Sequence, residues 1–127
     1  MPKHDDVVRL RHMLEHAREA IVLMEGKNHA DLESSRLHLL AIVRLVEIIG
    51  EAASRVSQAT QRKYPQIPWP QIIGMRNRLV HGYDVVDIGI VWQTVNEELS
   101  PLIAFQHFAP FRVLLPQGRD NCLRALA

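Results

Sequence analysis

Cysteine is almost absent from this chain of 127 residues, which contains Cys122 alone. A single thiol cannot close an intrachain disulfide, and no other cysteine is present to help build a zinc cluster. An excess of charge of either sign is missing too, since the formal net charge is only +1. A protein that coats nucleic acid through bulk electrostatics is therefore disfavoured, and any contact with a phosphate backbone has to be local.

Long apolar runs are missing as well. The first apolar stretch is interrupted by five charged residues, which are Arg9, Arg11, Glu15, Arg18 and Glu19. This pattern fits neither a signal peptide nor a membrane span, so we expect no membrane association and, by default, a cytoplasmic location. With 47% hydrophobic and 23% charged residues, the composition is that of an ordinary globular protein of one domain with a modest core.

No segment alternates with a period of two over a useful length, and the apolar residues instead recur at intervals of three and four. The first segment of this kind runs from about 5 to 24. Asp5 or Asp6 can cap the helix that it predicts, because a carboxylate accepts hydrogen bonds from the free amides of a first turn.

The second expected helix runs from about 31 to 57, with Asn28 or Asp31 as its cap, and has apolar residues on far more than one stripe. These residues are Leu37, Leu40, Val43, Leu45, Val46, Ile48, Ile49, Ala52, Ala53 and Val56. We therefore expect several elements to contact this helix, at the centre of the fold and partly in a subunit interface. Gly50 within it lowers the helix propensity by about 1 kcal/mol relative to alanine, and the close approach of another helix is the simplest compensation.

Prolines delimit the later helices. The segment before Pro70 is rich in proline and cannot be regular helix, whereas Pro70 itself suits a first helical turn. A third helix is expected to run from there to about His81. Asp84 or Asp87 starts the fourth, which Pro101 should kink or divide.

These patterns predict an all-α bundle of four or five helices over residues 1–110. After Pro110 the apolar pattern weakens. The tail, 111–127, is compatible with a short extra helix, an interface arm or a disordered end.

The segment 76–83 combines three residue types that suit phosphodiester chemistry. Arg76, His81 and Tyr83 stand in the pattern R-x-x-x-x-H-x-Y. Arginine keeps its charge and presents a planar fork that matches phosphate oxygens, while histidine can take or give a proton near neutral pH. The alternative is an ordinary helix C-terminus, where cations favour the negative end of the dipole and Gly82 supplies a left-handed cap.

Further anchors in a fixed order make the chain resemble a known family. They are Glu47, Gly50, Glu51, Pro68, Trp69, Gly74, Arg76, Asn77, His81, Gly82, Tyr83, Asp87 and Trp92. The chain resembles the HepT-like branch of the HEPN family from about 5 to 105, most closely over 67–102. The resemblance implies an up-and-down helical bundle, a homodimer and a metal-independent ribonuclease, so neither a cofactor nor a metal site is expected. It also implies a toxin encoded beside a minimal nucleotidyltransferase, its antitoxin.

In the RNA substrate that the resemblance implies, the 2′-hydroxyl can attack the adjacent phosphorus once its proton is removed. His81 is the candidate general base, or the acid for the leaving 5′-oxygen, and Arg76 is the candidate stabiliser of charge on the phosphate. On a continuous helix they are separated by roughly 140°, so either the helix unwinds near Gly82 or two subunits share a cleft. Asn77, on the same helix face as His81, would orient His81 or a phosphate. Arg78 is expected to be solvated or to steer phosphate.

Tyr83 can pack over the helix end or stack on a base. In the resembled family, the tyrosine of this motif is where the nucleotidyltransferase attaches AMP. A nucleotide at Tyr83 would block RNA through its bulk and its negative charge.

Glu47 and Glu51 lie four apart, so their side chains share a helix face. Paired carboxylates can serve acid–base catalysis. Here we expect them instead to anchor Arg44 or Arg55, or to hold the fork of Arg76 from behind.

Two alternatives compete with catalysis, namely a non-catalytic helical partner that docks a nucleotidyltransferase and a purely structural dimerisation domain. Neither needs Arg76, His81 and Tyr83 together. A metal site is a further alternative, because His12 and His16 are four residues apart, but this spacing is also that of a solvated helix face.

Overall fold

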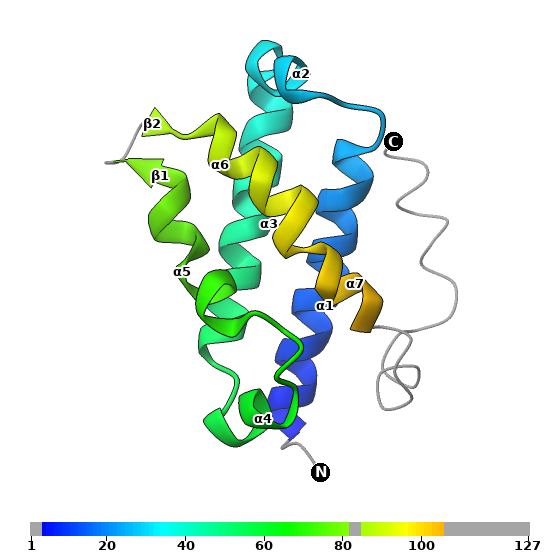
Figure 1. Cartoon of the computed structure of the whole chain (residues 1–127), viewed down its shortest axis with the longest axis vertical. Coiled ribbons are helices and arrows are strands. Elements are labelled where there is room, and N and C mark those ends of the chain that lie inside the picture. Colours follow the sequence, from blue (N-terminus) through cyan, green and yellow to red (C-terminus); the bar gives the residue numbers. More distant parts are fainter. Residues whose placement is uncertain (1–3, 82–84, 106–127) are drawn as a thin grey trace.

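A computed structural model describes residues 4–81 and 85–105 (Figure 1). Within these residues the chain forms seven α-helices, one π-helical turn and two strands of two residues each. The elements are α1 (His4–Met24), α2 (His29–Ser34), α3 (Arg36–Ser54), α4 (Gln58–Lys63), α5 (Trp69–Leu79), β1 (Val80–His81), β2 (Val85–Val86), α6 (Ile88–Gln93), η1 (Thr94–Glu98) and α7 (Ser100–Phe105). The fold is all-α, as the periodicity predicts, with more helices than the four or five expected. The tail, 111–127, lies outside the described residues.

One additional helix arises because the second expected helix is divided at Ser35, which is extended and separates α2 from α3. The Ser35 hydroxyl accepts a hydrogen bond from the backbone N–H of His38 and so starts a new helix. The cap predicted at Asn28 is confirmed, since Asn28 and Asp31 form a reciprocal capping box at the start of α2. Another additional helix, α4, lies in the connection that follows α3.

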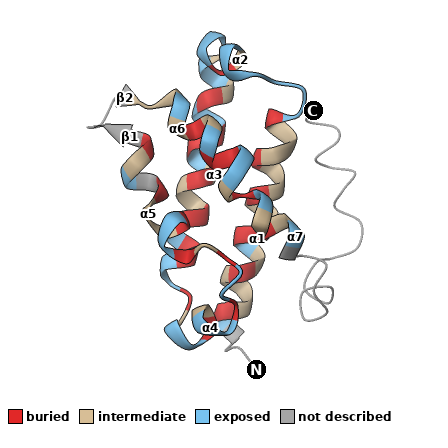
Figure 2. Ribbon diagram, viewed as in Figure 1, coloured by how far each residue is buried: buried red, intermediate tan, exposed pale blue. Residues whose placement is uncertain are grey.

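The helix α3 occupies the centre of the bundle, between α1 and α5 (Figure 1). Its buried residues are Leu39, Ile42, Val43, Val46, Ile49, Gly50, Ala52 and Ala53. The helix α6 and the turn η1 cross in front of it and add Val91 and Val95 to the same core, as does Leu99, which follows η1. Figure 2 shows the buried residues concentrated where the helices meet. The central position predicted for this helix is thus confirmed.

Among the described glycines, Gly50 leaves the least room for a Cβ atom, because α5 approaches α3 closely there. A Cβ atom at this position would lie 3.1 Å from the carbonyl oxygen of Ile72. That oxygen belongs to the backbone of a packed helix, so it cannot swing aside as a flexible side chain can. The close helix approach predicted at Gly50 is therefore confirmed. Gly74 on α5 differs, because a Cβ atom there would meet nothing within 4 Å.

We predict that Gly50→Ala and Gly74→Ala change stability in different ways. Alanine gains up to about 1 kcal/mol of helix propensity at either position, and Gly74→Ala should retain this gain. In Gly50→Ala this gain should be cancelled or reversed, because overpacking a core typically costs about 1–3 kcal/mol. Urea unfolding of both variants measures the difference. An equal increase in stability for both would show that the two backbones are not in contact at Gly50.

Pro101 produces the π-helical turn η1. Proline cannot donate a hydrogen bond to the carbonyl four residues earlier, and its ring crowds the preceding turn. The helix widens in response, so that the N–H of Leu99 donates to the carbonyl of Thr94, five residues earlier, at 3.1 Å. The fourth expected helix begins with α6, and its start agrees with one of the two predicted caps. The Asp87 side chain accepts a hydrogen bond from the N–H of Ile90 at 3.1 Å. The division predicted at Pro101 is also observed.

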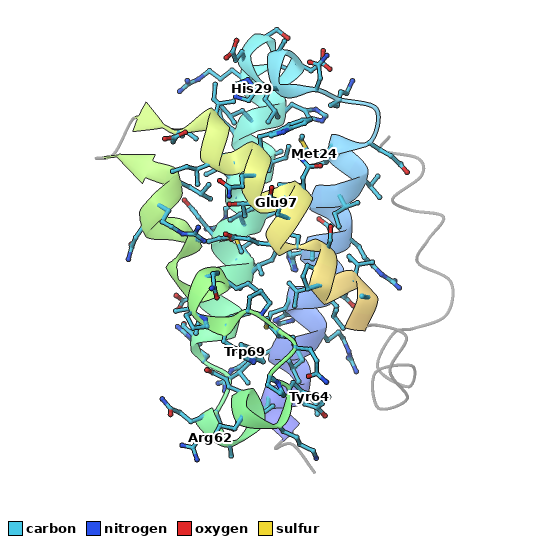
Figure 3. All side chains as sticks on the ribbon, in the orientation of Figure 1. Met24, His29, Arg62, Tyr64, Trp69 and Glu97 are labelled. Atoms are coloured by element: carbon cyan, nitrogen blue, oxygen red, sulfur yellow. The ribbon has the colours of Figure 1, made fainter. Side chains whose placement is uncertain are left out.

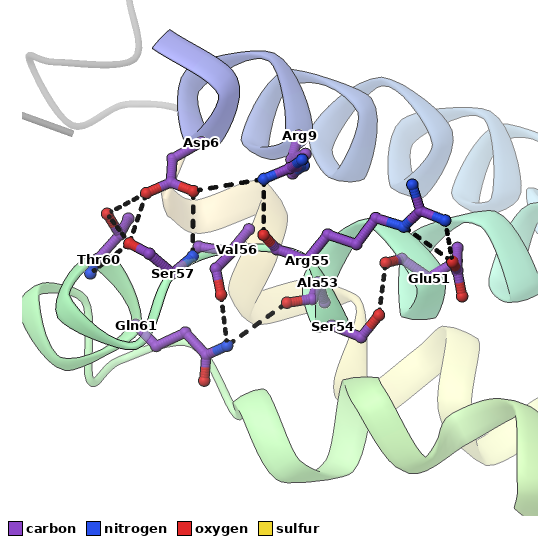
Figure 4. Close-up of polar contacts among 10 residues, drawn as sticks. All are labelled: Asp6, Arg9, Glu51, Ala53, Ser54, Arg55, Val56, Ser57, Thr60 and Gln61. Carbon is purple, nitrogen blue, oxygen red and sulfur yellow. Dashed lines mark hydrogen bonds and ion pairs between the residues drawn. The ribbon is translucent and has the colours of Figure 1, made fainter. Parts of the chain in front are cut away.

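Asp5 and Asp6, the two predicted caps of the first helix, both lie inside the first turn of α1, so neither is its cap. The side chain of Asp6 instead contacts the start of α4. It is 2% exposed, and its carboxylate accepts hydrogen bonds from the N–H and hydroxyl of Ser57 and from the hydroxyl of Thr60, at 3.0, 2.6 and 2.7 Å (Figure 4). Arg9 lies 3.8 Å from the same carboxylate. Burial raises the pKa of Asp6, but the hydrogen bonds from Ser57 and Thr60, with the charge of Arg9, outweigh it, so the pKa is lowered below its ordinary value. Asp6 thus fastens α1 to the start of α4.

We predict an acid-dependent loss of stability that Asp6→Asn removes. Because the pKa of Asp6 is lower in the folded chain, its contribution is complete above the unfolded pKa, near 3.8, and is lost as the pH falls through the folded pKa. At pH 7, Asp6→Asn should cost about 1–3 kcal/mol, because buried donors lose a charged acceptor. Urea unfolding between pH 7 and pH 2.5 should show this difference shrinking below about pH 4. A difference that does not change with pH would contradict the assignment.

Candidate active site

The proline-rich connection sets the start of α5, which carries the motif arginine. The indole N–H of Trp69 donates to the carbonyl of Tyr64 at 3.0 Å, and both side chains are buried at the end of the bundle that carries α4 (Figure 3). Pro70 then occupies the first turn of α5, as predicted. From this start, Ile72, Met75 and Leu79 are buried at helical spacing.

The end of α5 differs from the prediction, because the helix stops at Leu79 and does not reach His81. Val80 and His81 form strand β1, which pairs antiparallel with Val85 and Val86 of β2. The N–H of Asp87 donates to the carbonyl of Leu79 at 2.8 Å and so closes the ladder against the helix end. Valine favours extended backbone, so three valines around the turn compete with helix propagation.

The position of this helix end changes the predicted geometry of the motif. Arg76 lies on α5, three residues before its end, whereas His81 lies on β1. The helix therefore ends between them. Of the two alternatives predicted, an unwound helix or a cleft shared by two subunits, the first is observed, although the helix ends earlier than Gly82. The shared helix face predicted for Asn77 and His81 is wrong for the same reason. Asn77 is exposed on α5, and Tyr83 falls outside the described residues.

Glu47 and Glu51 anchor arginines, as predicted. A carboxylate oxygen of Glu47 lies 3.4 Å from Arg44, and one of Glu51 lies 2.9 Å from Arg55. The first pair lies within α3 and the second joins α3 to its C-cap residue, at spacings of three and four residues. Their support of Arg76 stays a prediction.

These pairs line a groove of about 650 Å³ between α1 and α3. The lining residues are Asp5, Val8, Arg9, His12, Arg44, Glu47, Ile48, Glu51, Ala52 and Arg55. Each of the three arginines has a carboxylate oxygen within 4 Å, at 3.8, 3.4 and 2.9 Å. Because a carboxylate lies beside each arginine, the net positive charge along the groove is smaller than its arginine content suggests.

Arg78, expected to be solvated or to steer phosphate, is partly exposed and paired with a carboxylate that the sequence did not predict. Its two terminal nitrogens donate to the two carboxylate oxygens of Glu98, at 2.9 and 2.8 Å. One of them also donates to the carbonyl of Gln71 at 2.7 Å. Hydrogen bonding to Glu98 raises the pKa of Arg78 above its ordinary value, against the effect of burial. Sequence reasoning missed this pair because Glu98 is 20 residues away, with no periodicity that links the two positions.

A family model described as ribonuclease HepT-like matches residues 12–107 of this chain. This chain belongs to the ribonuclease HepT-like family. The match confirms the resemblance drawn from the motif and its anchors, and it includes α3, α5, both strands and η1.

Two relatives of this HepT-like chain show the extent of the similarity. It is 36% identical over 93 residues to "Probable ribonuclease HepT" of Thermococcus cleftensis, covering 70% of this chain and 84% of that protein. It is 33% identical over 102 residues to "Putative RNase MJ1216" of Methanocaldococcus jannaschii, covering 80% of this chain and 84% of that protein. No solved structure matches the chain.

Two further features of this HepT-like chain bear on its function, namely the grouping of its possible metal ligands and the apolarity of its helices. Among the described residues, no three histidine, cysteine or carboxylate side chains are grouped so that they could hold a metal ion. The Nδ1 atom of His16 lies 2.7 Å from the carbonyl oxygen of His12 and donates to it, which occupies one nitrogen of the histidine pair. No helix in the described ranges combines the length and apolarity that crossing a bilayer requires.

Proposed function

We propose that this HepT-like chain is a metal-independent endoribonuclease in which Arg76 and His81 act on one phosphodiester. The end of α5 carries this proposal, because the chain leaves the helix between these two residues. The roughly 140° that would separate them on a continuous helix therefore does not apply. Membership of the ribonuclease family and the names of the relatives support the same activity.

The chemistry needs two proton transfers and one fixed cation. A base removes the proton of the 2′-hydroxyl, the 2′-oxygen attacks phosphorus, and the bond to the 5′-oxygen breaks as an acid protonates that oxygen. His81 can fill either role, and Arg76 stabilises the charge that builds on the phosphate oxygens. A single imidazole cannot be base and acid in the same step. A second His81, from another copy of the chain, supplies the missing partner in our proposal.

The surface of α3 supports this homodimer. Leu37 and Leu40 are 81% and 47% exposed, and they are the exposed large hydrophobic residues of the described chain. The helices α3 and α5 run antiparallel, so these leucines lie at the end of the bundle that also carries β1 (Figure 1). A second copy seated there buries apolar surface and brings two motif segments to one cleft.

The physiological role that we propose is that of a toxin silenced by a nucleotidyltransferase antitoxin. Tyr83 follows His81 by two residues, and the intact R-x-x-x-x-H-x-Y pattern supports it as the acceptor of AMP. A nucleotide attached there adds bulk and negative charge beside the path of the RNA phosphates. Blocking then needs no unfolding of the domain.

The purified, unmodified protein should cleave RNA in the presence of EDTA, and Arg76→Ala or His81→Ala should each lower the rate by about a hundredfold or more. Arg62→Ala is the matched control, because Arg62 is exposed on α4 at the opposite end of the bundle from β1 (Figure 3). Cleavage at the wild-type rate by folded, nuclease-free His81→Ala protein would refute the catalytic role of His81.

The same samples test the shared cleft. Wild type and both variants should be dimers at micromolar concentration in light scattering, since neither substitution touches the exposed leucines of α3. A monomeric wild type that cleaves RNA would remove the second His81 from the mechanism.

Tyr83→Phe should keep ribonuclease activity and escape silencing. The phenol has no role in the proposed acid–base steps, whereas AMP transfer requires its oxygen as nucleophile. The measurement is intact mass after incubation with the partner nucleotidyltransferase, ATP and Mg²⁺. Equal mass added to wild type and to Tyr83→Phe would identify another residue as the acceptor.

A further inference from the structure

Arg78 lies inside the R-x-x-x-x-H motif, yet its guanidinium group binds a carboxylate of the same chain. The carboxylate that it binds belongs to Glu98, the last residue of the π-helical turn η1. The Glu98 side chain is only 14% exposed, and that of Arg78 is 40% exposed. A planar fork with two parallel hydrogen bonds fixes direction as well as distance, which a single charge contact does not.

The backbone beside Arg78 is fixed in three consecutive ways. The side chain of Leu79 is fully buried, its carbonyl accepts from Asp87, and Val80 and His81 pair with β2. Arg78 adds a link to η1 and a hydrogen bond to the carbonyl of Gln71, about two helical turns before it on α5. The last turn of α5 is therefore held to η1 as well as to the core.

We propose that Arg78 is a positioning residue, whose ion pair with Glu98 holds the segment between Arg76 and His81 in place against η1. This inference rests on the proposed ribonuclease function. Loss of the pair frees the last turn of α5, and with it the relative placement of the two catalytic groups. Small misplacements of such groups reduce the rate of the chemical step more than they reduce substrate binding.

The competing role, direct binding of RNA phosphate by Arg78, makes opposite predictions for Glu98. A phosphate would have to displace the Glu98 carboxylate from both guanidinium nitrogens. Glu98→Gln would then release Arg78 and maintain or improve RNA binding. If Arg78 acts through Glu98, the two residues form one unit, and removing either has the same effect.

The experiment compares Arg78→Gln, Glu98→Gln, the double variant and the charge swap Arg78→Glu with Glu98→Arg. Each single variant should lower kcat by about ten- to a hundredfold, with KM changed little. The double variant should be no worse than the singles, and the swap should recover part of the activity. Glu97→Gln is the matched control, because Glu97 is the neighbouring residue of η1, is exposed and contacts Gln93.

Hydrogen exchange gives a readout that does not depend on cleavage. The amide of Asp87, which donates to Leu79, should exchange several-fold faster in both single variants. The amide of Gln61, which donates to Ser57 at the opposite end of the bundle, on α4, should not change. A conservative Arg78→Lys variant should fall between wild type and Arg78→Gln, since lysine keeps the charge and loses the fork.

Two results would overturn the proposal. In the first, Glu98→Gln keeps the wild-type kcat, while Arg78→Gln has a raised KM and a weaker salt dependence of RNA binding. This combination would assign Arg78 to RNA phosphate. The second is wild-type exchange of the Asp87 amide in both variants. If the wild type itself does not cleave RNA, the ribonuclease proposal fails separately, and the exchange rates still decide whether the pair holds this segment.

Discussion

The contact between the backbones of α3 and α5 at Gly50 determines where the candidate site lies. A carbonyl oxygen of α5 sits 3.1 Å from the place where any larger residue would put a Cβ atom. Because the helices meet this closely, Ile72, Met75 and Leu79 enter the core in one orientation. The direction in which α5 leaves the core follows from this contact, whereas its end at Leu79 follows from the pairing of β1 with β2.

The end of α5 combines three kinds of restraint within a few residues. Burial holds Leu79, a short ladder holds the backbone of His81, and an ion pair holds Arg78 to the π-helical turn. That turn exists because Pro101 disrupts the hydrogen bonding of the helix before it. A proline outside the motif, far from it in sequence, thus contributes to the surroundings of the motif. Catalytic groups on a rigid support keep their geometry without reorganisation during the reaction.

The sequence predicted features that depend on local chemistry and missed those that depend on tertiary contacts. Periodicity located α1 and the central helix, and cap chemistry located Asn28 and Asp87, since a cap is formed within four residues. The break at Ser35 was missed because the polar residues beside it, Ser34 and Arg36, are also compatible with the exposed face of a continuous helix. The ladder at His81 was missed because two residues are too few for an alternating pattern, and the pair of Arg78 with Glu98 because it joins two separate helices.

The most direct test of this account is the crystal structure of the protein with an oligoribonucleotide whose 2′-hydroxyls are all methylated, so that it binds without being cut. We predict a phosphate between the side chains of Arg76 and His81, at the end of α5, with Arg78 still paired to Glu98. A nucleic acid bound only in the groove between α1 and α3, beside Arg9, Arg44 and Arg55, would contradict the account.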